Sequence, residues 1–266
     1  MIVRAPEQGS KWRRECLARM VCATMAACAV IAAVPARAAP SVLFDKPVKV
    51  VRHALPHDPD NPQAKAELRC SYYPHFMVKE IDLGEPGADQ LSILPIAAGK
   101  SRDCKRANAS DEIVVKEWSG YLGGVKGEYI FWDADDGWNG GLGFAVTTAD
   151  GKKLFDDVAK PTLRAVQLAP DGSLTLRYTR VYGAPCSLRA DAAGCWSKIK
   201  QQTGLADPAP DCKAAYEREM KRVPKFAQQT IDDPTAVDYE AVTTISGGTA
   251  KIAAATGKAL ACRPED

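Results

Sequence analysis

Apolar and polar residues alternate along most of the chain, a pattern that is typical of half-buried β-strands. Strands are predicted where this alternation or an apolar run is clearest, at residues 47–54, 66–73, 76–83, 90–97, 128–133, 141–148, 163–168, 174–181, 238–245 and 250–254. Asp171-Gly172 and Gly247-Gly248 each separate two of these segments and are typical turn sequences, so both pairs are predicted to form hairpins.

Two segments in the last third of the chain have helix signals instead. One is predicted at residues 195–203, ending before Gly204, and the other at residues 212–223, capped by Asp211 and followed by Pro224. Many strands, two short helices and a final hairpin indicate an α+β fold with a mostly antiparallel, sandwich- or barrel-like sheet. We expect a β-rich main domain at residues 39–205, with a helix-plus-hairpin appendage at residues 206–266 packed on it.

The first 38 residues do not follow the strand pattern. A basic segment precedes an uncharged, Ala-rich run from Met20 to Val34, and the tripeptide Ala36-Arg37-Ala38 follows. This layout predicts a secretory signal peptide that is cleaved after Ala38. Arg13-Arg14 leaves export by the twin-arginine route open as well as ordinary secretion. We therefore expect a periplasmic or secreted protein with no membrane span in the mature chain.

Removal of this segment changes the charge and the cysteine count. The chain of 266 residues has 35 Lys+Arg, 33 Asp+Glu and nine cysteines, with a net charge of +2. The predicted signal peptide holds six of the basic residues, two of the acidic ones and three of the cysteines, which leaves a net charge of −2 and six cysteines. So small a charge gives no support for a nucleic-acid partner.

An even number of cysteines in an exported protein predicts a disulfide framework. Closeness in the sequence favours the pairs Cys70–Cys104, Cys186–Cys195 and Cys212–Cys262. The sequence contains no C-x-x-C motif after the predicted signal peptide, which argues against a zinc cluster or a redox site.

The segment from Trp118 to Phe144 concentrates aromatic, acidic and glycine residues. The simplest interpretation is a hairpin turn, because Asp, Asn and Gly readily adopt turn conformations. A second interpretation is a ligand-contact loop formed by Trp138, Asp135, Asp136 and Asn139. A third is a calcium site with oxygen ligands from Asp133, Asp135, Asp136 and Asn139, although the spacing is not that of an EF-hand.

Motifs for an activated serine, a zinc protease or a phosphate-binding loop do not occur in the sequence. Asp135 and Asp136 are adjacent and would point apart on an extended strand, so they form a poor acid–base pair. We assign no catalytic residue and expect a non-enzymatic binding protein whose aromatic-acidic loop at residues 132–144 contacts a small molecule, a glycan or a protein. The alternatives are a calcium-stabilised structural protein and a hydrolase acting on cell-envelope carbohydrate.

His53, His57 and His75 would form a zinc or copper site if the first strands brought them together, but solvated loop histidines are the simpler interpretation. The sequence therefore predicts no cofactor, with calcium as the alternative.

Overall fold

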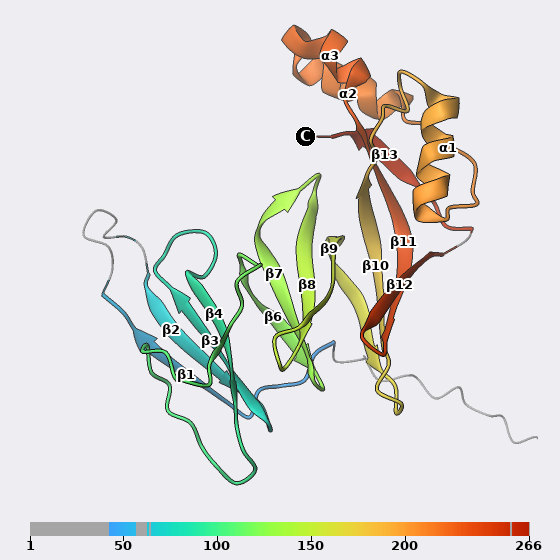
Figure 1. The fold of residues 1–266 in the computed structure, drawn as a ribbon. Coiled ribbons are helices and arrows are strands. Elements are labelled where there is room, and N and C mark those ends of the chain that lie inside the picture. Colours follow the sequence, from blue (N-terminus) through green and yellow to red (C-terminus); the bar gives the residue numbers. More distant parts are fainter. Residues whose placement is uncertain (1–42, 57–62, 64, 256, 266) are drawn as a thin grey trace, which may run out of the picture. The chain divides into compact units, whose positions relative to one another are not determined.

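The structure is a computed structural model that describes residues 43–56, 63, 65–255 and 257–265. The predicted signal peptide lies outside these residues. The described residues belong to one compact unit, Pro40–Asp266, and form two antiparallel sheets and three short α-helices (Figure 1). The predicted fold class is confirmed. Within the described ranges, none of the helices is both long and apolar enough to cross a membrane.

The first sheet is a meander in which each strand pairs with the next one along the chain. Its strands are β1 (Lys49–Ala54), β2 (Glu67–Tyr72), β3 (Phe76–Asp82), β4 (Gln90–Pro95) and β5 (Ile113–Val114). Strand β3 is buried along nearly its whole length, which requires that both faces of the sheet are covered there.

The second sheet has eight strands, and seven of them again follow sequence order. They are β6 (Tyr121–Lys126), β7 (Tyr129–Trp138), β8 (Gly141–Thr148), β9 (Lys153–Leu168), β10 (Leu174–Gly183), β11 (Thr235–Ser246) and β12 (Thr249–Ala254). The eighth strand, β13 (Ala261–Pro264), pairs with β11.

Three hydrophobic clusters pack the sheets against each other, against the helical segments and against a loop. One is shared between them, because Phe76, Val78 and Ile93 of the first sheet pack with Ile130 and Trp132 of the second. The largest cluster joins the opposite face of the second sheet to the helical segments. The third lies on the outer face of the first sheet, where residues of the 99–112 loop, including Cys104 and Ala109, cover it.

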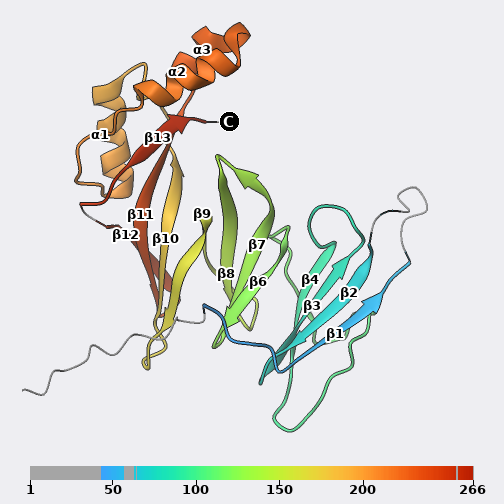
Figure 2. The same ribbon diagram turned by 180° about the vertical axis from the view of Figure 1, so that it is seen from behind.

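The helices lie between β10 and β11 in the sequence: α1 (Ala192–Thr203), α2 (Lys213–Arg222), the 3₁₀ turn η1 (Pro224–Phe226) and α3 (Ala227–Asp232). Both ribbon views place α2 and α3 at the end of the second sheet where β13 lies (Figures 1 and 2). Helix α1 begins where Asp191 accepts a hydrogen bond from the Gly194 N–H, and ends at Gly204, whose φ of 73° suits glycine.

The three predicted disulfides are confirmed. They are Cys70–Cys104, Cys186–Cys195 and Cys212–Cys262, which close chain separations of 34, 9 and 50 residues. Three disulfides within one chain are compatible with an oxidising compartment outside the cytoplasm.

Candidate functional site

The tip of the β7–β8 hairpin is a two-residue turn. Asn139 and Gly140 have φ values of 51° and 69°, and Trp138 pairs with Gly141 across them. Positive φ at both central residues is the geometry of a type I′ turn, for which Asn-Gly is a favoured sequence. The acidic, glycine-rich segment therefore contains a tight hairpin turn, the simplest of its three interpretations.

This turn is held against the C-terminal strand. Arg263 donates a hydrogen bond to the Asn139 carbonyl oxygen and forms an ion pair of 2.8 Å with Asp238. Lys160 contacts the other oxygen of Asp238 at 2.7 Å. The ring of Trp138 lies against Gly183, where a Cβ would be 2.5 Å from Cη2, yet the side chain stays 40% exposed. The hairpin tip thus combines a fixed backbone with an accessible indole.

The predicted site residues do not converge on one point. Asp135 and Asp136 are exposed, and Asp135 accepts a long hydrogen bond of 3.4 Å from Ser119. Asn139 is buried in the turn. Among the described residues, no group of three or more His, Cys, Asp or Glu side chains is arranged to hold a metal ion. Ligand contact and calcium binding by these residues both remain predictions.

Asp133 is placed differently from the other acids. It lies in the middle of β7, paired with Phe144, and its carboxylate rests against the backbone of Gly123 on β6. A Cβ at Gly123 would lie 2.6 Å from Oδ1 of Asp133, so a side chain at that position would displace the carboxylate. Glycine at position 123 thus makes room for the acid.

The Asp133 carboxylate faces a cavity of about 240 Å³. The residues that line the cavity are otherwise uncharged and mostly apolar: Leu43, Phe44, Gly123, Leu142, Phe144, Ala159, Pro161, Thr162 and Leu163. Small-molecule sites in proteins have this character, an apolar wall with few polar groups that orient the ligand.

Three breaks in the strand ladders surround this cavity. Gly123 is an extra residue between two β6–β7 pairs, and residues 134–136 interrupt the β7–β8 pairs next to Asp133. On β9, residues 161–164 leave the ladder opposite Tyr178. Pro161 cannot donate a ladder hydrogen bond, which suits it to such a break. Irregularities of this kind re-aim side chains and occur often beside functional sites.

Burial raises the pKa of Asp133 above its ordinary value. In the described part of the chain, neither a cation nor a hydrogen-bond donor is positioned to neutralise its carboxylate, while its backbone carbonyl accepts a bond of 3.3 Å from Trp118. A half-buried carboxylate without a protein partner is suited to accept a hydrogen bond or a positive charge from a ligand.

A second cavity of about 260 Å³ lies on the opposite face of β7. Trp118 and Trp132 line it, and the Trp132 indole donates a hydrogen bond of 3.0 Å to Thr147. Lys153 and Glu117, which stand 3.8 Å apart, are the charged pair among its lining residues. Lys116 also lines this cavity, and all three of these charged residues are exposed, so the cavity is the weaker candidate.

The sequence predicted Asp133 as a metal ligand but did not place it in an apolar cavity. One signal was available, because Asp133 ends an aromatic and apolar run that starts at Tyr129. The opposite wall of the cavity, Pro161 to Leu163, had no such signal, since its position depends on the strand register.

Comparison with known proteins adds no further information about this site. The chain matches no family model, no curated protein and no solved structure.

Proposed function

We propose that this protein is an exported, non-enzymatic binding protein that takes up a small apolar molecule with a cationic or hydrogen-bond-donating head group. The predicted signal peptide and the disulfides support the exported location. The observation that carries the proposal is the Asp133 carboxylate, which lies in a cavity with apolar walls and has no partner among the residues that the structure describes.

The aromatic rings of the cavity support a cationic head group in particular. Phe44 and Phe144 both line the cavity, and Phe44 packs on Phe131 with ring centroids 5.0 Å apart. Aromatic faces attract ammonium groups, and this attraction strengthens where water is excluded. An alkylamine would place its ammonium group at Asp133 and its chain along the apolar wall.

The side chains that line the cavity favour ligand binding over hydrolysis. Glycoside hydrolysis by the usual route needs two carboxyl groups on either side of one bond. Among the described residues that line the cavity, Asp133 is the one acidic side chain. A lone carboxylate can orient a ligand, but it does not complete this acid–base pair.

The test is calorimetric titration with n-hexylamine and, separately, with n-hexanoate. We expect the amine to bind and the acid not to bind, because the acid would meet the like charge of Asp133. In Asp133→Asn the amine should bind at least about tenfold more weakly, since a hydrogen bond to a charged group contributes about 1.5–3 kcal/mol.

Asp135→Asn is the matched control, because it removes the same charge from an exposed position on the same strand. It should leave binding of the amine unchanged. Equal binding of amine and acid, or equal losses in the two variants, would show that the Asp133 cavity is not the site.

A further inference from the structure

A buried charge pair lies in the first sheet, away from the Asp133 cavity. Lys79 projects from β3 with its side chain 0% exposed, and its Nζ lies 2.6 Å from Oε1 of Glu112, which is 1% exposed. Apolar side chains, including Met77, Ile81 and Leu94, surround it in the outer cluster of the sheet. Placing both charges there is costly, because burial removes the water that would stabilise them.

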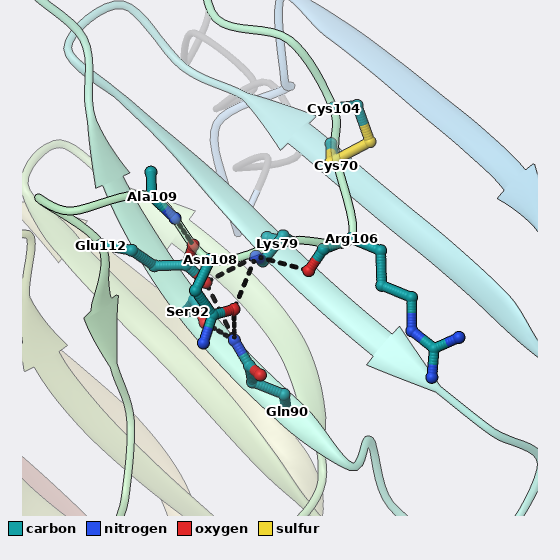
Figure 3. Close-up of polar contacts among 9 residues, drawn as sticks. All are labelled: Cys70, Lys79, Gln90, Ser92, Cys104, Arg106, Asn108, Ala109 and Glu112. Atoms are coloured by element: carbon teal, nitrogen blue, oxygen red, sulfur yellow. Dashed lines mark hydrogen bonds and ion pairs between the residues drawn. A yellow bond between two sulfur atoms is a disulfide. The ribbon is translucent and has the colours of Figure 1, made fainter.

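An amide stands beside this pair. The side-chain oxygen of Asn108 accepts a hydrogen bond of 3.3 Å from Lys79 Nζ and another of 2.9 Å from Nε2 of Gln90 (Figure 3). The hydrogen bond from Gln90 polarises the C=O bond and would stabilise the negative charge that forms on this oxygen when Lys79 attacks the carbon.

Glu112 is held as a proton acceptor. Its Oε2 accepts a bond of 2.9 Å from the Ala109 N–H, and Gln90 donates to Oε1 at 2.9 Å. Burial acts to raise the pKa of Glu112, but the hydrogen bonds from Lys79 and Ala109 outweigh it and lower the pKa. The carboxylate is therefore ionised, and the 2.6 Å between its Oε1 and Lys79 Nζ is the geometry of a direct proton transfer from the ammonium group.

The loop that carries Asn108 is anchored over β3. The Cys70–Cys104 disulfide ties it to β2, and Tyr72 donates a hydrogen bond of 2.9 Å to the Arg102 carbonyl. Holding an amine and an amide in contact removes much of the entropic barrier to reaction between them.

We propose that Lys79 and Asn108 form an intramolecular isopeptide bond, with Glu112 as the proton shuttle. Glu112 takes a proton from Lys79, and the neutral amine attacks Cγ of Asn108 to form the new C–N bond. Glu112 delivers its proton to the original amide nitrogen, and the bond from Cγ to that nitrogen breaks. The nitrogen of Lys79, now bonded to Cγ, still carries one surplus proton, and Glu112 takes up this proton. One ammonia molecule leaves for each bond formed, and no oxidant or other reactant is consumed. Asn108 is exposed at the rim, which gives the ammonia a path to solvent.

Mass spectrometry of the intact protein tests this directly, once the N-terminal residue has been established. We expect the mass to be lower than that of the three-disulfide chain by one ammonia. Reduction of the disulfides should leave this deficit in place. After digestion, the peptide that contains Lys79 should be joined to the peptide that contains Asn108.

Two variants identify the bond. Asn108→Ala, on the exposed rim, removes the electrophile and should abolish the deficit while preserving the fold, as judged by circular dichroism. Glu112→Gln should abolish it by removing the proton acceptor. As a matched control, Ser110→Ala changes an exposed side chain on the same loop and should retain the deficit. A full mass in the unmodified chain, or an ammonia deficit without the joined peptide, would overturn the proposal.

Discussion

Trp132 and Trp138 lie on the same strand and have opposite environments. Trp132 is fully buried in the core between the sheets, with its indole hydrogen-bonded to Thr147, whereas Trp138 is 40% exposed at the hairpin tip. Successive side chains of a strand point to opposite faces of the sheet. Trp132 therefore packs in the core between the two sheets, whereas its neighbour Asp133 lines the cavity on the other face.

Replacement of the two tryptophans should therefore have unequal effects. Trp132→Ala should reduce the free energy of unfolding by about 3–5 kcal/mol, because it leaves a large void in the core. Trp138→Ala should reduce it by less than about 1 kcal/mol, as is usual at exposed positions. Urea denaturation followed by circular dichroism measures both values. Similar losses in the two variants would contradict the assignment of their environments.

Asp133 makes stability depend on pH. Because burial raises its pKa, the folded protein keeps a proton on Asp133 in a pH range where the unfolded chain has lost it. The contribution of Asp133 to the free energy of unfolding therefore falls as the pH rises through this range. Asp133→Asn removes this contribution, so the variant should gain stability relative to the unmodified protein as the pH increases.

Thermal melts of both proteins from about pH 4 to pH 8 measure this difference while cancelling the titration of all other groups. The melting temperature of the variant minus that of the unmodified protein should increase with pH, and this difference should level off above the folded-state pKa of Asp133. A gap that stays constant would show that Asp133 is not perturbed by burial.

At the scale of elements, strands and helices with strong local signals were predictable. The β9–β10 and β11–β12 hairpins and the two longer helices lie where the apolar pattern and turn residues place them, whereas β7 was predicted only as far as Asp133. β6 was missed because Gly123 and Gly124 weaken its strand signal, although the ladder to β7 includes Gly124. The first half of β9 was missed because its Asp and Pro residues are rare in strands, yet β8 pairs with part of it.

Helix α1 offers a test of such local signals. Asp191→Ala should reduce the free energy of unfolding by about 1 kcal/mol, because it removes the side chain that caps the Gly194 N–H. Asp191→Asn keeps an acceptor there and should cost much less. Chemical denaturation measures both variants, and a neutral Asp191→Ala would mean that tertiary packing alone sets the start of α1.

At the scale of the whole molecule, the disulfides tie segments of very different separation. Cys212–Cys262 links the start of α2 to β13, whereas Cys186–Cys195 closes a short loop that leads into α1. In the loop-entropy model, a disulfide stabilises more when it closes a longer loop, because it restricts the unfolded chain more strongly.

Replacing both cysteines of a pair by alanine should show this difference. Loss of Cys212–Cys262 should cost about 1.5 kcal/mol more than loss of Cys186–Cys195, from the separations of 50 and 9 residues. Denaturation under non-reducing conditions measures it. A larger cost for the short loop would indicate that packing around Cys195, rather than loop entropy, dominates.

Local pattern was enough to predict the antiparallel fold class and most strand positions, because these depend on neighbours in the chain. The cysteine pairs were predictable because each bridge joins two cysteines that are consecutive in the sequence. The functional geometry required tertiary structure. Asp133 meets its cavity only because three ladder breaks place Gly123 and Pro161–Leu163 around it. Lys79 meets Asn108 and Glu112 only because the disulfide-tied loop folds back over β3. Alternation specifies which face a residue takes, whereas register and loop path decide which distant residues share that face.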